Sequence, residues 1–215
     1  MKRRPNTFIF LGALLLGASY WPASHVGWPL APMLAWKGAS VGLLALWAML
    51  AARDRDGWLL ANLLAFGALG DVVISAFGMV PGALAFLAGH VLAIQLYLTN
   101  RRKGGRLGVG IALIVPVFAY LITQDVGATV YALGLGGMAG TAWMSRFPRE
   151  HVALGALLFV ASDLLLFAHA GPLAGQDWPS WLIWPLYFAG QALIAYGVVQ
   201  TLERRKANED LHHRL

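Results

Sequence analysis

Three charged residues lie inside long apolar stretches of this chain, where a charge is unusual. They are Lys37, Asp71 and Asp163. Moving an ionised side chain to the middle of a bilayer costs roughly 2.5–3.5 kcal/mol on insertion scales, so such residues commonly serve a function. The three side chains therefore predict a functional site inside a membrane protein.

Other polar residues are predicted at a similar depth. A helix rises about 1.5 Å per residue, and counting from the outer end of each apolar stretch places several side chains in one layer, roughly 10–15 Å below the outer surface. Such a layer is typical of a water-accessible pocket in the outer half of the bilayer. We predict Asp71 and Asp163 as its catalytic residues, and as its substrate-binding residues Lys37, His90, Tyr131, Tyr187 and Gln191.

Two carboxyl groups in a lipid-walled pocket can act as a general acid and a general base. Low dielectric and mutual repulsion favour one protonated and one ionised group, and a cation such as Lys37 stabilises the ionised one. Pairs of this kind catalyse reactions that pass through an oxocarbenium-like cation, as in glycosidases. This chemistry needs neither a metal nor a cofactor, and we predict neither.

The composition indicates an integral membrane protein. The chain has 59% hydrophobic and 12% charged residues and a mean hydropathy of +0.64, which is too apolar for a soluble domain of 215 residues. The formal net charge is +6, but the basic residues fall in short loops and so indicate membrane orientation rather than nucleic-acid binding. Cysteine is absent from the sequence, which excludes disulfides and thiolate catalysis.

The apolar stretches predict an all-α protein with eight transmembrane helices. Each stretch approaches the roughly 20 residues that a membrane-spanning helix needs. We predict one transmembrane domain over residues 1–201 and a charged cytoplasmic tail over residues 202–215. The predicted helices cover residues 7–22, 29–50, 58–78, 80–99, 107–123, 126–146, 150–170 and 180–201.

The basic residues predict the orientation of the chain. Every Lys and Arg except Lys37 lies near a terminus or in one of the alternate loops around residues 53–55, 101–106 and 146–149. Because basic loops face the cytoplasm, we predict that both termini are cytoplasmic, in the inner membrane of a bacterium. The first apolar stretch also has features of a signal peptide, whose removal would leave seven spans. We expect this stretch to be retained.

An internal repeat is predicted when Asp71 is aligned with Asp163. Residues 64–71 then match residues 156–163, and residues 86–90 match residues 187–191. This alignment implies a parallel repeat of four helices plus four, with the two aspartates facing one another on related helices.

Each of the polar residues also has a purely structural interpretation. Lys37 could extend to the outer headgroups, and either aspartate could form only an ion pair with Lys37. A buried His90 could serve only in hydrogen bonding between helices, as tyrosines and glutamines in membranes often do. The concentration of polar groups in one layer favours a pocket over these interpretations.

The ordered set of motifs resembles the YhhN-type lysoplasmalogenases, a family of multi-span membrane proteins. The similarity covers about residues 30–200, and Gly38 departs from the Pro expected after the lysine. The resemblance is carried by Lys37, Leu69-Gly70-Asp71, Phe86-x-x-Gly89-His90 with Tyr97, Tyr131, Met138, Gly155-Ala156-Leu157-Leu158-Phe159-x-x-Ser162-Asp163 and Tyr187-x-x-x-Gln191.

The resemblance implies hydrolysis of the vinyl-ether bond of lysoplasmalogens to a fatty aldehyde and glycerophosphoethanolamine or glycerophosphocholine. It implies Asp71 and Asp163 as the acid and base, in either order, and Lys37 beside a carboxylate or the lipid phosphate. The remaining polar residues would position water and the glycerol oxygens. The expected partners are a lysophospholipid substrate and the lipid bilayer, with no nucleic acid and with the oligomeric state left open.

Three other functions are retained as alternatives. A metal-dependent lipid hydrolase would bind zinc through His90, Asp71 and Asp163, although such enzymes usually place several histidines in the membrane. A non-enzymatic lipid transporter or scramblase would also need a polar cavity. A purely structural protein is the least favoured, because three buried charges are costly.

Overall fold

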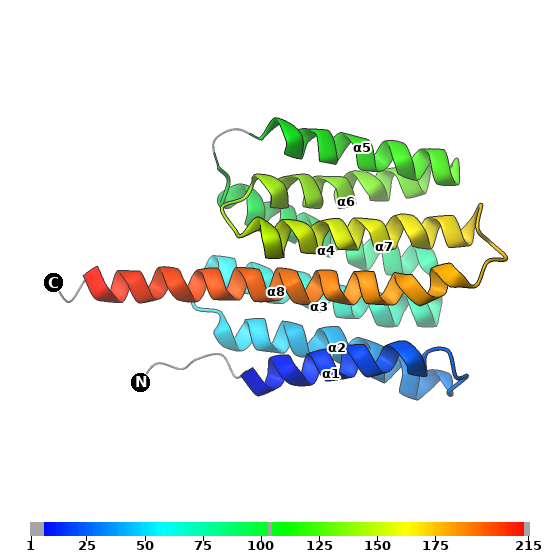
Figure 1. Cartoon of the computed structure of the whole chain (residues 1–215), viewed down its shortest axis with the longest axis horizontal. Coiled ribbons are helices and arrows are strands. Elements are labelled where there is room, and N and C mark those ends of the chain that lie inside the picture. The colour runs from blue at the N-terminus through cyan, green and yellow to red at the C-terminus, as the bar shows by residue number, and fades with distance from the viewer. Residues whose placement is uncertain (1–6, 103–104, 213–215) are drawn as a thin grey trace.

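The computed structural model describes residues 7–102 and 105–212, and this part of the chain folds into a bundle of eight α-helices without a β-strand (Figure 1). The all-α prediction is confirmed, and each predicted span coincides with one helix to within a few residues at its start. A short π-helix, η1, leads into the seventh α-helix. The helices are α1 Thr7–Ala23, α2 Leu30–Ala51, α3 Arg55–Phe77, α4 Met79–Thr99, α5 Arg106–Thr123, α6 Val126–Met144, η1 Arg149–Ala153, α7 Leu154–Ala170 and α8 Trp178–His212.

Six of the described helical segments are long and apolar enough to cross a bilayer: α2, α3, α4, α5, η1 with α7, and α8. Helix α1 is apolar but has only 17 residues, and the many glycines of α6 lower its hydropathy. The exposed face of α5 carries Leu113, Val117 and Leu121 one helical turn apart. Lipid is the solvent that suits such a face. The fold is therefore that of a multi-pass membrane protein.

Successive helices pack side by side as antiparallel pairs, with α2, α3 and α4 in one group and α5 beside α6. Helix α8 packs mainly against α7 and also contacts α1, α2 and α3, so it joins the two parts of the bundle. Gly155 and Gly190 permit the close α7–α8 contact, because a Cβ atom at either position would lie 2.6 Å from the other's carbonyl oxygen. Because Gln191 follows Gly190, this contact places a predicted site residue of α8 next to α7.

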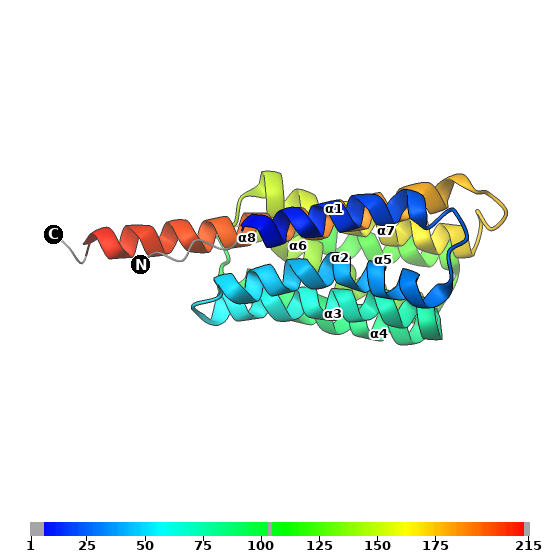
Figure 2. The ribbon, with the colours of Figure 1, turned by 90° about the horizontal axis from the view of Figure 1, so that it is seen from below.

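Both ends of the described chain lie at the same end of the bundle (Figures 1 and 2). Arg205 joins three helices there: its Nη1 lies 3.6 Å from Asp56 Oδ2 and donates to Asn100 Oδ1 at 2.8 Å. Nearby, the backbone N–H of Arg102 donates a hydrogen bond to the carbonyl oxygen of Met144. This bond joins the loop after α4 to the loop after α6. The basic loops thus lie together, as the alternating pattern predicts, whereas Lys2, Arg3, Arg4, Lys103 and Arg214 fall outside the described residues. Which end faces the cytoplasm stays a prediction.

Helix α8 continues well beyond the span predicted for it. It reaches His212 and projects past the other helices (Figure 2). The sequence predicts a charged tail from residue 202 onward because the apolar stretch ends there, but residues such as Leu202, Glu203 and Lys206 are good helix formers. The ion pair of Arg205 with Asp56 also fixes the first turns of this extension.

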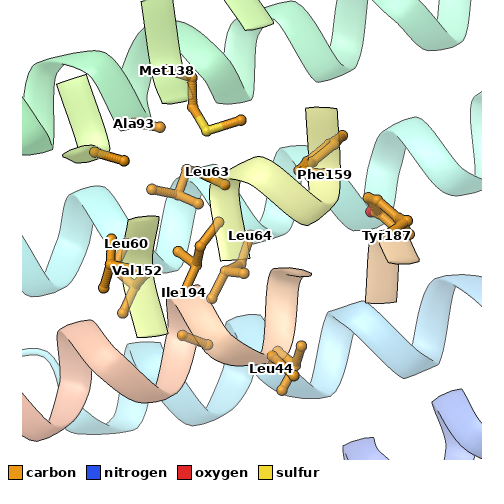
Figure 3. Close-up of a cluster of buried hydrophobic side chains, with 14 of the residues drawn as sticks. Leu44, Leu60, Leu63, Leu64, Ala93, Met138, Val152, Phe159, Tyr187 and Ile194 are labelled. Atoms are coloured by element: carbon orange, nitrogen blue, oxygen red, sulfur yellow. The ribbon is translucent and has the colours of Figure 1, made fainter. Parts of the chain in front are cut away.

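One part of the apolar core lies between the polar layer and the end of the bundle that holds both termini. Leu44, Leu60 and Leu64 come from α2 and α3 and face Val152 and Ile194 from the C-terminal half (Figure 3). Phe159 and Tyr187 border this cluster. The core therefore supports the polar residues from one side.

Candidate active site

Asp71 lies on α3 and is buried, with 2% of its surface exposed. The hydroxyl of Tyr187 donates to its Oδ2 at 2.8 Å. The Lys37 ammonium, from α2, lies 3.7 Å from Oδ1 and donates to Ser75 Oγ at 3.1 Å. Because Ser75 is one helical turn after Asp71, α3 offers two ligands to the same ammonium. Asp71 is therefore held by a cation and a phenol.

Glycine at position 38 fits this contact. A Cβ atom at Gly38 would lie 2.6 Å from Val72 Cγ2, on the residue next to Asp71. The glycine therefore lets α2 approach α3 where the lysine meets the aspartate. Its departure from the expected Pro leaves the lysine's position intact.

Asp163 lies on α7 and has different partners. The hydroxyl of Tyr131, from α6, donates to its Oδ2 at 2.6 Å, and Tyr131 Oη lies 3.1 Å from His90 Nε2 on α4. No cation pairs with Asp163 within the described ranges. The adjacent Ser162 donates instead to the Ile183 carbonyl of α8 at 2.9 Å. Ser162 therefore anchors α7 to α8 and does not act on its neighbour.

Aromatic rings bring the two halves of the site together. The Phe159 ring lies 5.0 Å from the Tyr187 ring and 5.1 Å from the His90 ring, measured between centroids. Phe159 therefore contacts both the tyrosine that donates to Asp71 and the histidine that lies against Tyr131. All the residues predicted for the site are thus in two adjacent hydrogen-bond networks, one ending at each aspartate.

Counting donors fixes the orientation of two side chains that have ambiguous hydrogens. The single hydroxyl proton of Tyr187 goes to Asp71, so Gln191 must present its NH₂ group to Tyr187 Oη, at 3.3 Å. By the same argument Tyr131 accepts from His90, which must carry its proton on Nε2. The Gln191 oxygen, Oε1, therefore points away from Tyr187.

A small cavity lies between the two networks. Side chains of α3, α4, α6, α7 and α8 line it, among them Phe86, His90, Tyr97, Met138, Phe159 and Gln191. It leaves space for about one water molecule. A lysolipid is much larger than this cavity.

A pair of aromatic rings from α8 and α1 lies on the side of Lys37 toward the end of the bundle opposite the termini. Its Nζ lies 5.8 Å from the Trp184 ring centroid, and the Tyr20 ring packs on Trp184 at 4.5 Å. The Trp184 indole donates to the Gly17 carbonyl at 2.8 Å, which attaches α1 to α8. The Lys37 side chain keeps 17% of its surface exposed, so its ammonium is partly accessible on this side of the site.

The sequence reasoning missed Ser75, Tyr20 and Trp184. Ser75 could have been found from its spacing, because residues four apart share a helix face. Tyr20 and Trp184 carry no such signal. Aromatic residues near a membrane boundary are usually attributed to the interfacial belt, and only the packing of α1 on α8 places these two beside Lys37.

One serine matches a hydrolase motif in its letters but not in its structure. Residues 38–42 read Gly-Ala-Ser-Val-Gly, and a Gly-x-Ser-x-Gly nucleophile requires a sharp turn between a strand and a helix. Here Ser40 lies inside α2, is fully buried and donates to the Trp36 carbonyl at 2.8 Å. Its hydroxyl is therefore engaged by its own helix.

The geometry does not favour the zinc-binding alternative. In the part of the chain that the structure describes, no three His, Asp, Glu or Cys side chains gather in a way that could hold a metal ion. His90 Nε2 is hydrogen-bonded to the Tyr131 hydroxyl, and each aspartate accepts a hydrogen bond from a tyrosine hydroxyl. The arrangement can instead donate and accept protons at two carboxyl groups.

Comparison with known proteins agrees with the family resemblance found in the sequence. The chain is 28% identical over 180 residues to lysoplasmalogenases of Mycobacterium bovis (strain ATCC BAA-935 / AF2122/97) and Mycobacterium tuberculosis (strain CDC 1551 / Oshkosh), with 76% of this chain and 69% of each relative covered. No solved structure matches the chain significantly. The YhhN family profile matches residues 33–198, a range that contains both aspartates and all their partners. The chain belongs to the YhhN family.

Proposed function

We propose that this protein is a lysoplasmalogenase-like hydrolase that cleaves the vinyl-ether bond of lysoplasmalogens. The observation that carries the proposal is the pair of buried aspartates, Asp71 and Asp163, which lie in adjacent hydrogen-bond networks and have different partners. The mycobacterial relatives named lysoplasmalogenase support the choice of substrate. The products are a fatty aldehyde and a glycerophosphoethanolamine or glycerophosphocholine.

We infer the roles of the two aspartates from their partners. Asp71 faces the Lys37 ammonium and accepts a hydrogen bond from Tyr187, and both contacts favour the ionised form. Asp163 accepts one hydrogen bond from a phenol and has no cation beside it in the described residues, so its ionised form is stabilised less than that of Asp71. Asp163 is therefore the general acid and Asp71 the general base.

The reaction then proceeds without a covalent intermediate. Asp163 transfers its proton to the alkenyl β-carbon, and the α-carbon becomes an oxocarbenium ion. Asp71 accepts a proton from water while the water oxygen bonds to the α-carbon, which gives a hemiacetal. When the hemiacetal collapses, its hydroxyl proton passes to Asp163 and the proton on Asp71 passes to the departing glycerol oxygen. Both aspartates return to their starting states.

The substrate reaches this centre from the side of Lys37. A lysolipid in the leaflet at that end can place its phosphate near the partly exposed ammonium and its alkenyl ether near the aspartates, deeper in the bundle. The alkenyl chain of the lipid then packs against the lipid-facing helices. With both termini in the cytoplasm, this position corresponds to the outer half of the inner membrane.

The proposal is tested with purified protein in detergent and three matched lysolipids. A 1-alkenyl lipid should release aldehyde in excess EDTA. The 1-alkyl analogue has no basic carbon to protonate, and a 1-acyl analogue needs a nucleophile or an activated water, so both should be spared. Efficient cleavage of the acyl lipid, or loss of activity on chelation that zinc restores, would falsify the acid/base mechanism. Lipid redistribution across vesicles without aldehyde release would instead indicate a transporter.

A further inference from the structure

Two buried polar atoms beside the candidate site have no partner within the described part of the protein. They are the hydroxyl oxygen of Tyr97 and Oε1 of Gln191. Tyr97 is fully buried and Gln191 is 2% exposed. Buried polar atoms are nearly always hydrogen-bonded, to protein or to ordered water, so two in one place require an explanation.

The two side chains line the same cavity. Tyr97 comes from α4 and Gln191 from α8, and the space between them and their neighbours accommodates about one water molecule. Gln191 Oε1 can only accept a hydrogen bond, whereas the Tyr97 hydroxyl can donate and accept. One water molecule would satisfy both, because it can donate to the amide oxygen and accept from the phenol.

We propose that this cavity is a binding site for one water molecule, and that Tyr97 is a positioning residue that acts through it. The water holds the Gln191 amide with its oxygen toward the cavity and its NH₂ toward Tyr187. Tyr187 in turn donates to Asp71. The water thus fixes the chain of hydrogen bonds that orients the general base. This catalytic consequence rests on the proposed function, but the water site itself does not.

The size of the cavity selects water over other hydroxyl compounds. The glycerol part of a lysolipid carries hydroxyl groups of the same hydrogen-bonding chemistry, but it is larger than the space available. The rings of Phe86 and Phe159 also line the cavity, with their centroids 6.0 Å apart. A substrate hydroxyl could therefore reach Tyr97 only if the surrounding side chains moved.

The first test needs no substrate. Tyr97→Phe removes one hydroxyl and keeps the ring, and Tyr120→Phe is a matched control because Tyr120 is 46% exposed on α5. If water is bound, the Tyr97→Phe protein should unfold at a lower temperature than the wild type, and the control should not. A dry cavity predicts the opposite, since the mutation would remove an unpaired buried hydroxyl. A higher unfolding temperature for Tyr97→Phe would therefore overturn the proposal.

The second test measures the catalytic consequence with the alkenyl lysolipid. Tyr97→Phe should lower kcat roughly 3- to 10-fold, the effect expected for one hydrogen bond, with KM unchanged. In a Gln191→Leu background it should have no further effect, because both residues act through one water. Independent, multiplicative effects would overturn the proposal, and so would a raised KM with unchanged kcat, which would indicate a substrate hydroxyl in the cavity. If the wild-type protein releases no aldehyde, only the proposed function fails, and the unfolding test still decides the water site.

Discussion

Replacing each aspartate by asparagine separates its catalytic role from its structural one. Asparagine has the shape of a protonated aspartic acid, so it should imitate the native state of Asp163 but not that of Asp71. Both Asp71→Asn and Asp163→Asn should lower turnover at least about 10²-fold, the usual scale for a lost general acid or base. That factor corresponds to about 2.7 kcal/mol of transition-state stabilisation. The two variants should nevertheless differ in stability.

The expected stability difference comes from the contacts of each carboxyl group. Asp71→Asn removes a partly exposed ion pair with Lys37, which contributes up to about 1 kcal/mol. It also turns the charge-assisted bond from Tyr187 into a neutral one, at a cost of about 1 kcal/mol. A loss of about 1–2 kcal/mol lowers the unfolding temperature by about 2–8 °C in a chain of this size. Asp163→Asn keeps its bond from Tyr131, so its unfolding temperature should stay within about 2 °C.

Two measurements on detergent-purified protein decide between these outcomes. Thermal unfolding can be followed by the fluorescence of the nine tryptophans, and turnover by release of aldehyde from the alkenyl lysolipid. If Asp163→Asn is destabilised as much as Asp71→Asn, both carboxyl groups are ionised and the assigned roles are wrong. Near-normal turnover in either folded variant would remove that aspartate from the mechanism.

Three further outcomes are expected. The pH profile of kcat/KM should be bell-shaped. Lys37→Met should move the low-pH limb of this profile to higher pH, because the ionised Asp71 loses its neighbouring cation. Movement of that limb to lower pH would contradict the assignment of Asp71 as the general base. Gly190→Ala should lower the unfolding temperature, because the added methyl overpacks the contact of α7 with α8 at a cost of about 1–3 kcal/mol. Gly110→Ala is the control, because a Cβ atom there meets open space, and it should not lower the unfolding temperature. Equal unfolding temperatures for the two variants would refute the close contact. Topology reporters should read outside after residues 25, 79, 125 and 175 and cytoplasmic after residues 54, 103, 148 and 206, and two successive sites on one side would exclude eight spans.

The helices could be predicted from sequence because a bilayer imposes a length on apolar stretches. The start of α5, for example, follows directly from the basic loop at residues 101–106. The end of α8 could not be predicted in this way. The hydropathy of a segment predicts where it leaves the membrane. The length of the helix depends instead on helix propensity and on contacts such as Arg205–Asp56.

The members of the site could also be predicted, but their pairing could not. A count of residues along each helix gives the depth of a side chain and leaves its direction around the helix open. Nothing in the sequence therefore says that Tyr187 donates to Asp71 while Tyr131 donates to Asp163. Tyr97 illustrates the same limit. It lines the cavity together with Gln191 of α8, and only the tertiary packing shows that its hydroxyl lacks a partner within the described residues.

The predicted repeat, which stays a prediction, suggests how one scaffold produces an acid and a base. If α1–α4 correspond to α5–α8, then each aspartate is contacted by a residue of the preceding helix. That residue is Lys37 for Asp71 and Tyr131 for Asp163. Two equivalent carboxyl groups that repel one another would otherwise have no fixed preference for which one ionises. A cation on one and a phenol on the other would break the symmetry, so that one substitution between related helices fixes the direction of proton flow.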